Sequence, residues 1–590
     1  MRYKQARKLY NRRQKQALNL SKQAGDNLDK HVLGRFGRLL AVRRFVFSWL
    51  MFWGLLAIIV GWQIANLSVY FQTVEPVPGG IYNEGIYGNL TNVNPIYATS
   101  EVDSSLSRLI FAGLLTYNNR NQLVDCLASN YSVDSSGKTY IVHLKPGLTW
   151  QDGKPLTAAD VVFTFDTIKN VNAQSPLYSS WQGVNISAVN SLTVKFSLPN
   201  PLASFPYNLT TGIIPKHILG SISPSELRSA NFNTVDPVGS GPFKWHAIEV
   251  NGDTPQNAIE QIGLLPFSGY VLGKPRLAEF IVHAYASKAQ LIDAFNSGQL
   301  NGLAGLGSVP KSLVRNSVHI YSPLLTAGDY VFFKTNTAPL NDVAVRRALV
   351  LASNPQSIIS RLKYNTIPVN EPLLIGQLAY NVKYAQLAND PTQAKQILSQ
   401  DGWQISKNGF EYKNGQMLQF NLVTTNTSEN HLVVSMLQSQ WRAIGANLQP
   451  IYESANTYST TIQDHNYNMT LNAISIGIDP DVFVYWDSSQ YDPRSTDLNF
   501  SDYNNTNADI ALEAGRTRLN PALRVIKYRS FLADWQKDAP ALGLYQPRAL
   551  YITRQTVYGL NVHEMNTPEG RYNNVQNWEI LTANVTDPHT

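Results

Sequence analysis

The chain has 590 residues, of which 44% are hydrophobic, 11% aromatic and 15% charged, with a formal net charge of +7 at pH 7. This length predicts several domains, and the apolar content excludes a mainly disordered chain. The single cysteine, Cys126, excludes an intramolecular disulfide framework and any metal site built from several cysteines of one chain.

The positive charge is concentrated at the N-terminus. Residues 1–44 contain 13 lysine and arginine residues and two acidic residues, Asp26 and Asp29, which gives this basic tail a formal charge of +11. The rest of the chain has 35 basic and 39 acidic residues and carries −4. A tail of this kind suits anionic lipid headgroups. We expect no nucleic-acid partner, although binding of nucleic acid by the tail stays open as a rival.

An uncharged apolar segment follows the basic tail. No charged residue occurs between Arg44 and Glu75, and residues 45–64 alone make 20 positions, the length of a helix that crosses a hydrocarbon core of about 30 Å. We predict a transmembrane anchor helix over residues 45–66. Because Lys and Arg beside a first span resist translocation, we expect a single-pass protein of the cell membrane, with a cytoplasmic N-terminus and an extracytoplasmic main body.

A cleaved signal peptide is the competing interpretation of this segment. The long basic region, the apolar core of more than about 15 residues and the lack of an A-x-A-like site after Ile64 speak against it. A lipid anchor on a cysteine next to the span is excluded, because Cys126 lies far downstream. An uncleaved anchor is therefore the preferred interpretation.

After a short linker at residues 67–78, strands and helices alternate to the end of the chain. Residues 138–156 alternate apolar and polar side chains and then turn at Asp152-Gly153, which predicts a strand and a turn. Thr157 and Asp160 have the spacing of a capping box that opens a helix. Strands interleaved with helices indicate the α/β fold class.

Local turn and cap signals support these elements. Three helices are predicted to begin with an Asn or Asp cap followed by proline, at Asn354-Pro355, Asp390-Pro391 and Asn520-Pro521. Asn408-Gly409 and Asn414-Gly415 bracket a short strand, as two tight hairpin turns would.

The common motifs of enzymes are missing. The sequence has no G-x-x-x-x-G-K-[ST] phosphate loop, no H-E-x-x-H zinc motif and no G-x-S-x-G elbow, and its ten histidines lack the spacing of metal ligands. We therefore expect no enzymatic activity, no catalytic residue, no metal and no cofactor. An extracellular hydrolase with an unrecognised pair of carboxylates stays open as an alternative.

Six blocks of residues occur in the order found in a known family. They are Asn94-Pro95 with residues 108–114; residues 127–128, 140 and 144–161; residues 239–243; residues 333–336, 339–342 and 345–349; residues 394–403; and residues 538–540 with 544–545. The run W-x-D-G-x-P-L-T-A-x-D-V at residues 150–161 is the most specific of them. From about Gly79 onward the chain resembles the family 5 extracellular solute-binding proteins, the peptide- and nickel-binding receptors of bacterial ABC importers.

The resemblance implies a two-lobed, periplasmic-binding-protein-like fold of class II, whose lobes close over a ligand by a hinge motion. By analogy, the first lobe comprises residues 79–328 and 540–590, with an extra subdomain at about 118–236. The second lobe is residues 329–539, and the chain is expected to cross between lobes near residues 329–333 and 539–545.

The resemblance also implies which residues line the ligand cleft. One expected segment follows Asn94-Pro95, and another is the strand at residues 471–477, which resembles the segment that pairs with a bound peptide. The expected ligand-binding residues are Ser100, Glu101, Val102, Asn472, Ala473, Ile474, Ser475, Ile476 and Asp479, with Tyr485, Trp486 and Tyr545 as aromatic walls.

At one position the chain departs from the family pattern. In oligopeptide receptors an aspartate a few residues before the Asp/Glu-Pro pair binds the free amino terminus of the ligand, whereas this chain has Ile476 at that spacing from Asp479-Pro480. A buried ammonium without a carboxylate partner is costly. An apolar, internally anchored or uncharged ligand is therefore favoured, with Glu101 or Asp479 as the candidate substitute for the missing aspartate.

The sequence thus predicts a membrane-anchored extracytoplasmic receptor that captures peptides or a related solute between its lobes. It would deliver this solute to an ABC transporter, with the permease and ATPase subunits as partners, and would itself be a monomer. An extracytoplasmic sensor or adhesin with the same fold and no role in transport is the alternative.

Overall fold

The computed structural model describes residues 2–28, 30, 43–70, 72–313, 318–362, 364, 366–492 and 497–586. The chain divides into two compact units, Met1–Pro76 with Thr582–Thr590 and Val77–Leu581. Each unit is described by itself.

The first unit contains the N-terminal helices. They are α1 (Arg2–Leu28) and α3 (Arg43–Tyr70), and they are followed by β1 (Gln72–Val77), which pairs with β23 (Leu581–Thr586). Within α3, Arg44–Ile64 is long and apolar enough to cross a membrane. A signal sequence has the same properties, so the anchor at residues 45–66 stays a prediction. The expected linker at residues 67–78 is largely helix and strand, because β1 finds a partner from the other end of the chain.

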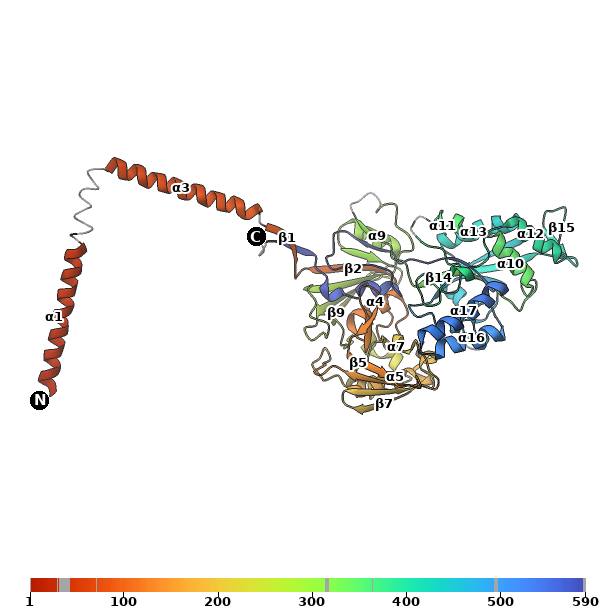
Figure 1. The fold of residues 1–590 in the computed structure, drawn as a ribbon, viewed down its shortest axis with the longest axis horizontal. Helices are drawn as coiled ribbons and strands as arrows, with labels where there is room; N and C mark the ends of the chain where they lie inside the picture. The colour runs from red at the N-terminus through yellow and green to blue at the C-terminus, as the bar shows by residue number, and fades with distance from the viewer. Residues whose placement is uncertain are drawn as a thin grey trace. The chain divides into compact units, whose positions relative to one another are not determined.

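The first large sheet of the second unit has seven strands in the order β13-β22-β12-β2-β11-β10-β9. Figure 1 labels two of its strands, β2 and β9, and the helix α4. The strand β2 runs parallel to its neighbours β11 and β12, and the other pairs are antiparallel. The helix α4 packs Val102, Leu106 and Leu109 into the core of this region, a spacing that puts them on one helix face. The elements are β2 (Ile81–Tyr87), α4 (Glu101–Ile110), β9 (Phe243–Asn251), β10 (Ile259–Pro266), β11 (Glu279–Tyr285), α9 (Lys288–Asn296), β12 (Gly302–Ala304), β13 (His319–Tyr321) and β22 (Tyr551–Thr553).

A smaller antiparallel sheet with the order β5-β6-β8-β7 is built from residues between β2 and β9. The capping box predicted there is present, since Asp160 Oδ2 accepts the Thr157 N–H at 2.8 Å at the start of α5. The predicted turn is also confirmed, with Gly153 at a φ of +86°. The elements are β3 (Leu115–Tyr117), β4 (Leu123–Asp125), β5 (Ala128–Val133), β6 (Thr139–Leu144), α5 (Ala158–Ile168), α6 (Tyr178–Trp181), β7 (Asn185–Asn190), β8 (Thr193–Ser197), α7 (Phe205–Asn208) and α8 (Lys216–Leu219).

The second large sheet has five strands in the order β19-β18-β20-β14-β21. Tyr330 and Phe332 of β14 lie in one apolar cluster, and Val331 and Phe333 lie in another. Because successive strand residues point to opposite faces, both faces of this sheet are covered, which is typical of α/β proteins. The elements are β14 (Ala327–Phe333), α10 (Val343–Ala352), α11 (Pro355–Ile359), α12 (Pro391–Gln400), β18 (Gln419–Thr425), α13 (Ser428–Arg442), β19 (Asn447–Glu453), α14 (Ala455–Gln463), β20 (Met469–Ser475), α15 (Phe483–Trp486), α16 (Thr506–Thr517), α17 (Pro521–Asp538) and β21 (Ala541–Tyr545).

The predicted caps and hairpin turns of this region are confirmed. The side chains of Asn354, Asp390 and Asn520 accept backbone N–H groups at the starts of α11, α12 and α17, each with proline in the first turn. A three-stranded antiparallel meander carries the two Asn-Gly turns. It consists of β15 (Gln404–Ile405), β16 (Glu411–Lys413) and β17 (Gln416–Met417).

The chain changes between the two large sheets twice. It leaves the first sheet after β13 and enters the second at Ala327, and it returns between Tyr545 and Tyr551. Residues 541–545 were expected in the first lobe, yet they form β21, which is needed in the second sheet as the partner of β14. We therefore propose that the lobe boundary on the return follows Tyr545.

Candidate ligand-binding cleft

The strand β20 leaves one edge open over its C-terminal half. On one side it pairs with β14 along its whole length, from Met469 opposite Phe333 to Ser475 opposite Ala327. On the other side, β18 pairs only with Met469 and Thr470. Among the described residues, positions 471–475 therefore have a strand on one side only.

The backbone groups at this open edge belong to alternate residues. The N–H of Ile476 donates to Thr326 O at 2.9 Å and so points toward β14, whereas Leu471 O accepts the Tyr458 hydroxyl at 3.0 Å from the opposite side. Since strand residues alternate in direction, Ala473 and Ser475 also point away from β14. Their side chains are exposed, so this edge can accept an extended segment.

A cavity of about 1020 Å³ lies beside the end of β20. One wall comes from residues 476–490 and 497–518 and includes Ile476, Gly477 and Asp479; the other comes from Tyr117 and residues 179–208 around the smaller sheet. Ligand sites of proteins commonly have volumes of about 300–1,000 Å³. The cavity is therefore large enough for a ligand of several residues.

Two hydrogen bonds join the walls of this cavity. The Ser204 hydroxyl donates to Asp481 Oδ2 at 2.8 Å, and the Ala203 N–H donates to Arg516 O at 2.9 Å. The Arg516 guanidinium lies 3.3 Å from the same Asp481 oxygen. These contacts connect the end of α16 to the segment just before α7.

Asp479 lines the cavity, but its carboxylate is already engaged. Arg524 donates to both of its oxygens, at 2.8 and 2.5 Å. Burial alone would lower the pKa of the Arg524 guanidinium, and the Asp479 carboxylate reverses this and raises that pKa above its usual value. The pair is thus a charged bidentate bridge, and Asp479 has little capacity left for a ligand amine.

Ser100, Glu101 and Val102 stand at the start of α4. Ser100 is the N-cap and its hydroxyl accepts the Asp103 N–H at 3.0 Å, while Val102 is completely buried. The Glu101 carboxylate lies 3.5 Å from Arg571, whose guanidinium also binds buried Glu84 at 2.8 Å. Burial raises the pKa of Glu101, and Arg571 acts in the opposite direction. Glu101 therefore also has an internal cationic partner.

The remaining expected residues divide between the edge and the core. Ile476 lines the cavity, Asn472 is half-buried and Ile474 is buried in the apolar cluster behind β20. Tyr485 donates its hydroxyl to Ser475 O at 2.7 Å, next to the open edge. Trp486 is 0% exposed and Tyr545 is 1% exposed. These last two are core residues in this structure and do not form an open aromatic wall.

A group of polar side chains near the open edge was not expected. Asp329 lies directly across from Ala473 on β14, and burial, followed by the charge of Glu429, raises the pKa of Asp329 to about 8. Glu429 accepts the hydroxyls of Tyr545 at 3.0 Å and Tyr364 at 2.7 Å. The sequence signal was a lone carboxylate within the apolar strand AGDYVFF.

No metal site accompanies the cleft in the part of the chain that the structure describes. No group of three or more His, Cys, Asp or Glu side chains is placed there to hold an ion. The chemistry of the cleft is that of hydrogen bonding, apolar contact and charge.

Comparison with known proteins identifies the family. The model of the bacterial extracellular solute-binding proteins, family 5 Middle, matches residues 122–494. The oligopeptide-binding protein AppA of Bacillus subtilis (strain 168) is 24% identical over 533 residues, which cover 88% of this chain and 95% of AppA. The glutathione-binding protein GsiB of Pectobacterium atrosepticum is 25% identical over 372 residues, or 61% of this chain and 66% of GsiB.

Solved structures share the fold. AppA of Bacillus subtilis in complex with a nonapeptide superposes with a TM-score of 0.70 at 22% identity, covering 86% of this chain and 100% of AppA. The ABC transporter substrate-binding protein CtaP of Listeria monocytogenes gives 0.73 at 24% identity, covering 85% and 99%. The resemblance seen in the sequence and the two-lobed α/β fold are therefore confirmed. The chain belongs to the bacterial extracellular solute-binding proteins of family 5, a family of substrate-binding receptors and not of enzymes.

Proposed function

We propose that this receptor captures peptides, or solutes of similar extended shape, along the open edge of β20. The proposal rests on Ala473 and Ser475, whose backbone groups face away from β14 next to Ile476, which lines the large cavity. Ser475 O already accepts the Tyr485 hydroxyl, so the groups offered to a ligand are the N–H of both residues and Ala473 O. An extended peptide added to such an edge is held by main-chain hydrogen bonds and tolerates many side chains. The relatives named for oligopeptide binding support this ligand class.

The proposed ligand is anchored along its length and not by its amino terminus at residue 476. Ile476 offers no charge there, and the neighbouring carboxylate of Asp479 is held by Arg524. Removing either partner of that buried pair would leave an uncompensated charge. A free terminal ammonium would therefore find no available carboxylate partner at this point.

Asp329 is the carboxylate that we propose for a ligand cation. It faces Ala473 across the β14–β20 pair, and no described residue donates a hydrogen bond to its side chain. A cation placed beside it would favour the charged form and lower its pKa. Peptides with a lysine or arginine opposite Ala473 should accordingly bind best.

Thermal unfolding of the full chain in the presence of peptide libraries tests the proposed function. Peptides of about two to nine residues should raise the unfolding midpoint, because a ligand that binds only the folded state stabilises it. Matched peptides with N-methylated amides should not, since they lack the donors that strand addition needs. If neither peptides nor other small solutes raise the midpoint, the receptor does not bind this ligand class.

We further propose that α3 anchors the receptor in the membrane and that the protein hands its ligand to an ABC permease with its ATPase. The +11 tail beside the apolar helix favours a cytoplasmic N-terminus. The receptor is proposed to act as a monomer without covalent chemistry. Cross-linking in the host cell should recover permease subunits, and recovery of a signalling protein instead would favour the sensor alternative.

A further inference from the structure

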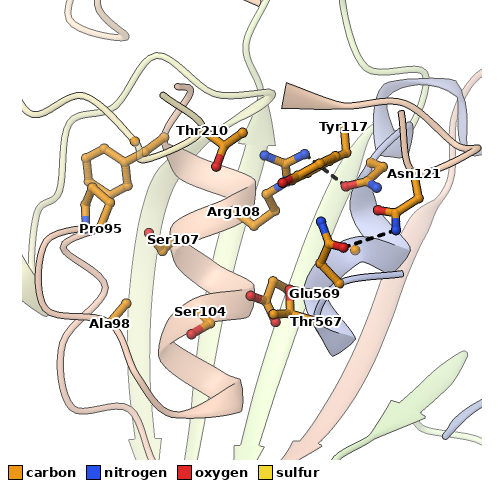
Figure 2. Close-up of a pocket in the computed structure, with 15 residues that line it drawn as sticks. Pro95, Ala98, Ser104, Ser107, Arg108, Tyr117, Asn121, Thr210, Thr567 and Glu569 are labelled. Atoms are coloured by element: carbon orange, nitrogen blue, oxygen red, sulfur yellow. Dashed lines mark hydrogen bonds between the residues drawn. The ribbon is translucent and has the colours of Figure 1, made fainter. Parts of the chain in front are cut away.

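A second, smaller pocket lies beside α4 in the region of the first sheet. Its volume is about 200 Å³, and only Tyr117 is shared with the large cavity. Figure 2 shows Arg108 reaching from α4 toward Tyr117 and Asn121, with Thr567 and Glu569 of the C-terminal segment nearby. The pocket is thus assembled from parts of the chain that are more than 400 residues apart in sequence, and it does not touch the open edge of β20.

Arg108 supplies a cation with unused donors. Its Nη2 donates to Thr116 Oγ1 at 2.5 Å and to Asn573 Oδ1 at 2.9 Å, which fixes the guanidinium in place. Its Nη1 and Nε have no hydrogen-bond partner among the described residues, and no described carboxylate lies within 4.0 Å of the group. The free Nη1 and Nε lie on different edges of the guanidinium, and each can donate a single hydrogen bond to an anionic ligand group.

Asn121 supplies an acceptor that nothing in the described chain satisfies. The residue is 8% exposed, and its Oδ1 has no hydrogen-bond partner. Its Nδ2 donates to Asn566 Oδ1 at 3.2 Å, so the amide nitrogen is already used. A buried acceptor without a donor costs free energy, and a ligand N–H group that bonds to this oxygen would remove that cost.

Glu569 supplies the opposite charge in the same pocket. Its side chain is half-buried, and none of the described residues forms a hydrogen bond or ion pair with it. The pocket therefore holds a cation and an anion that are not paired with each other, together with an unsatisfied amide oxygen. This combination is complementary to a small molecule that carries both a carboxylate and an ammonium group.

We propose that this pocket binds a free α-amino acid or a zwitterion of similar size. The ligand carboxylate lies on Arg108, and its ammonium donates to Asn121 Oδ1 and faces Glu569. The site is independent of the peptide cleft, because none of these three residues lines the large cavity. It adds a second ligand class to a receptor whose cleft is proposed for peptides.

Isothermal titration calorimetry on the full chain in detergent tests this proposal. The probes are the proteinogenic amino acids, tested singly, and the deaminated acid and decarboxylated amine of the best binder. At least one amino acid should bind, and both truncated analogues should bind roughly tenfold or more weakly, because each leaves one charge of the pocket unpaired. Binding of no amino acid, or equal binding of the deaminated acid, would overturn the proposal.

Variants locate the binding site. Arg108→Gln and Glu569→Gln should each weaken amino-acid binding about tenfold or more and leave peptide binding unchanged. Arg120→Gln is the matched control. Arg120 is exposed, precedes Asn121 in the sequence and does not line the pocket. If Arg108→Gln fails to fold after losing its bonds to Thr116 and Asn573, Glu569→Gln carries the test. If Ala473→Pro abolishes amino-acid binding and Glu569→Gln does not weaken it, the amino acid binds in the peptide cleft, which would contradict the proposal.

Discussion

In the region of the second large sheet, burial disfavours the charged form of two carboxylates, Glu371 and Asp329. Glu371 is 0% exposed, and its Oε2 has no hydrogen-bond partner among the described residues. Burial raises its pKa from 4.5 to about 8, although the Asn381 N–H acts in the opposite direction. The folded protein therefore binds a proton at Glu371 that the unfolded chain releases above its own pKa.

This proton makes stability depend on pH in a defined direction. Because the folded pKa of Glu371 exceeds the unfolded value, stability should fall as pH rises from about 4.5 to about 8 and then level off. Glu371→Gln should remove this loss, which amounts to roughly 4 kcal/mol between pH 5 and pH 9. Unfolding midpoints of the variant and the wild type at pH 5 and pH 9 measure the difference. Glu249→Gln, an exposed glutamate, is the control, and parallel curves for wild type and Glu371→Gln would contradict the assignment.

Asp329 should act as a pH-dependent part of the ligand site. Its pKa of about 8 means that most molecules carry a neutral Asp329 at pH 7, unless a cationic ligand binds beside it. Peptides with lysine or arginine should therefore bind more tightly as pH rises toward 8 and above. Asp329→Asn should weaken these peptides about tenfold and leave uncharged peptides unaffected. Calorimetric titration with matched lysine and norleucine peptides checks this, and an equal effect on both would contradict it.

Residue-scale predictions from the sequence succeed where the interaction is local. The caps at Asn354, Asp390 and Asn520 were predictable because each side chain bonds to an N–H two or three residues ahead. Burial was not predictable in this way. Trp486 is buried although Phe483 and Val484 of the same helix line the cavity, and Tyr545 lies in a strand that is buried throughout, so aromatic character gave no sign of whether either residue faces a cleft or a core.

The strand β20 is the element on which the proposed binding mode depends. Its location was predictable from the family resemblance, and the structure places a strand at Met469–Ser475. The open edge of β20 was not predictable. It exists because β18, some fifty residues earlier in the sequence, pairs only with the first two residues of β20. A strand with one unpaired edge is a template for another extended segment.

A proline at the open edge should disable this element without disturbing the sheet. Ala473→Pro removes an N–H that faces away from β14, so no native strand bond is lost. Peptide affinity should fall about tenfold or more, with little change in the unfolding midpoint. Ala473→Ser keeps the N–H and is the matched control. Unchanged peptide affinity in Ala473→Pro, measured by calorimetry, would rule out main-chain pairing at this residue.

At the scale of the whole molecule, the chain passes twice between the two large sheets. The sequence suggested both passages but placed the return near residue 540, and the pairing of β14 with β21 moves it beyond Tyr545. Sheet membership depends on contacts more than 200 residues apart in sequence, which local patterns do not encode. The hydrogen bonds from Ser204 to Asp481 and from Ala203 to Arg516 of α16 show where the region of the smaller sheet meets that of the second large sheet.

The orientation in the membrane can be measured with introduced cysteines. Cys126 is 1% exposed, and burial raises its pKa to about 11, so the native thiol should not react with a maleimide. In intact cells, a membrane-impermeant maleimide should label Thr254→Cys and spare Ser21→Cys until the cells are opened. Both positions are exposed in the protein. Labelling of Ser21→Cys in intact cells would contradict a cytoplasmic tail.

We expect a peptide ligand to be held by main-chain hydrogen bonds to the open edge of β20. Hydrogen exchange of the full chain, read at single residues with and without a saturating peptide, tests it most directly. Exchange should slow at Ala473 and Ser475 and change little at Asn472 and Ile474, whose amides already face β14. A peptide that binds and leaves the exchange of Ala473 and Ser475 unchanged would contradict it.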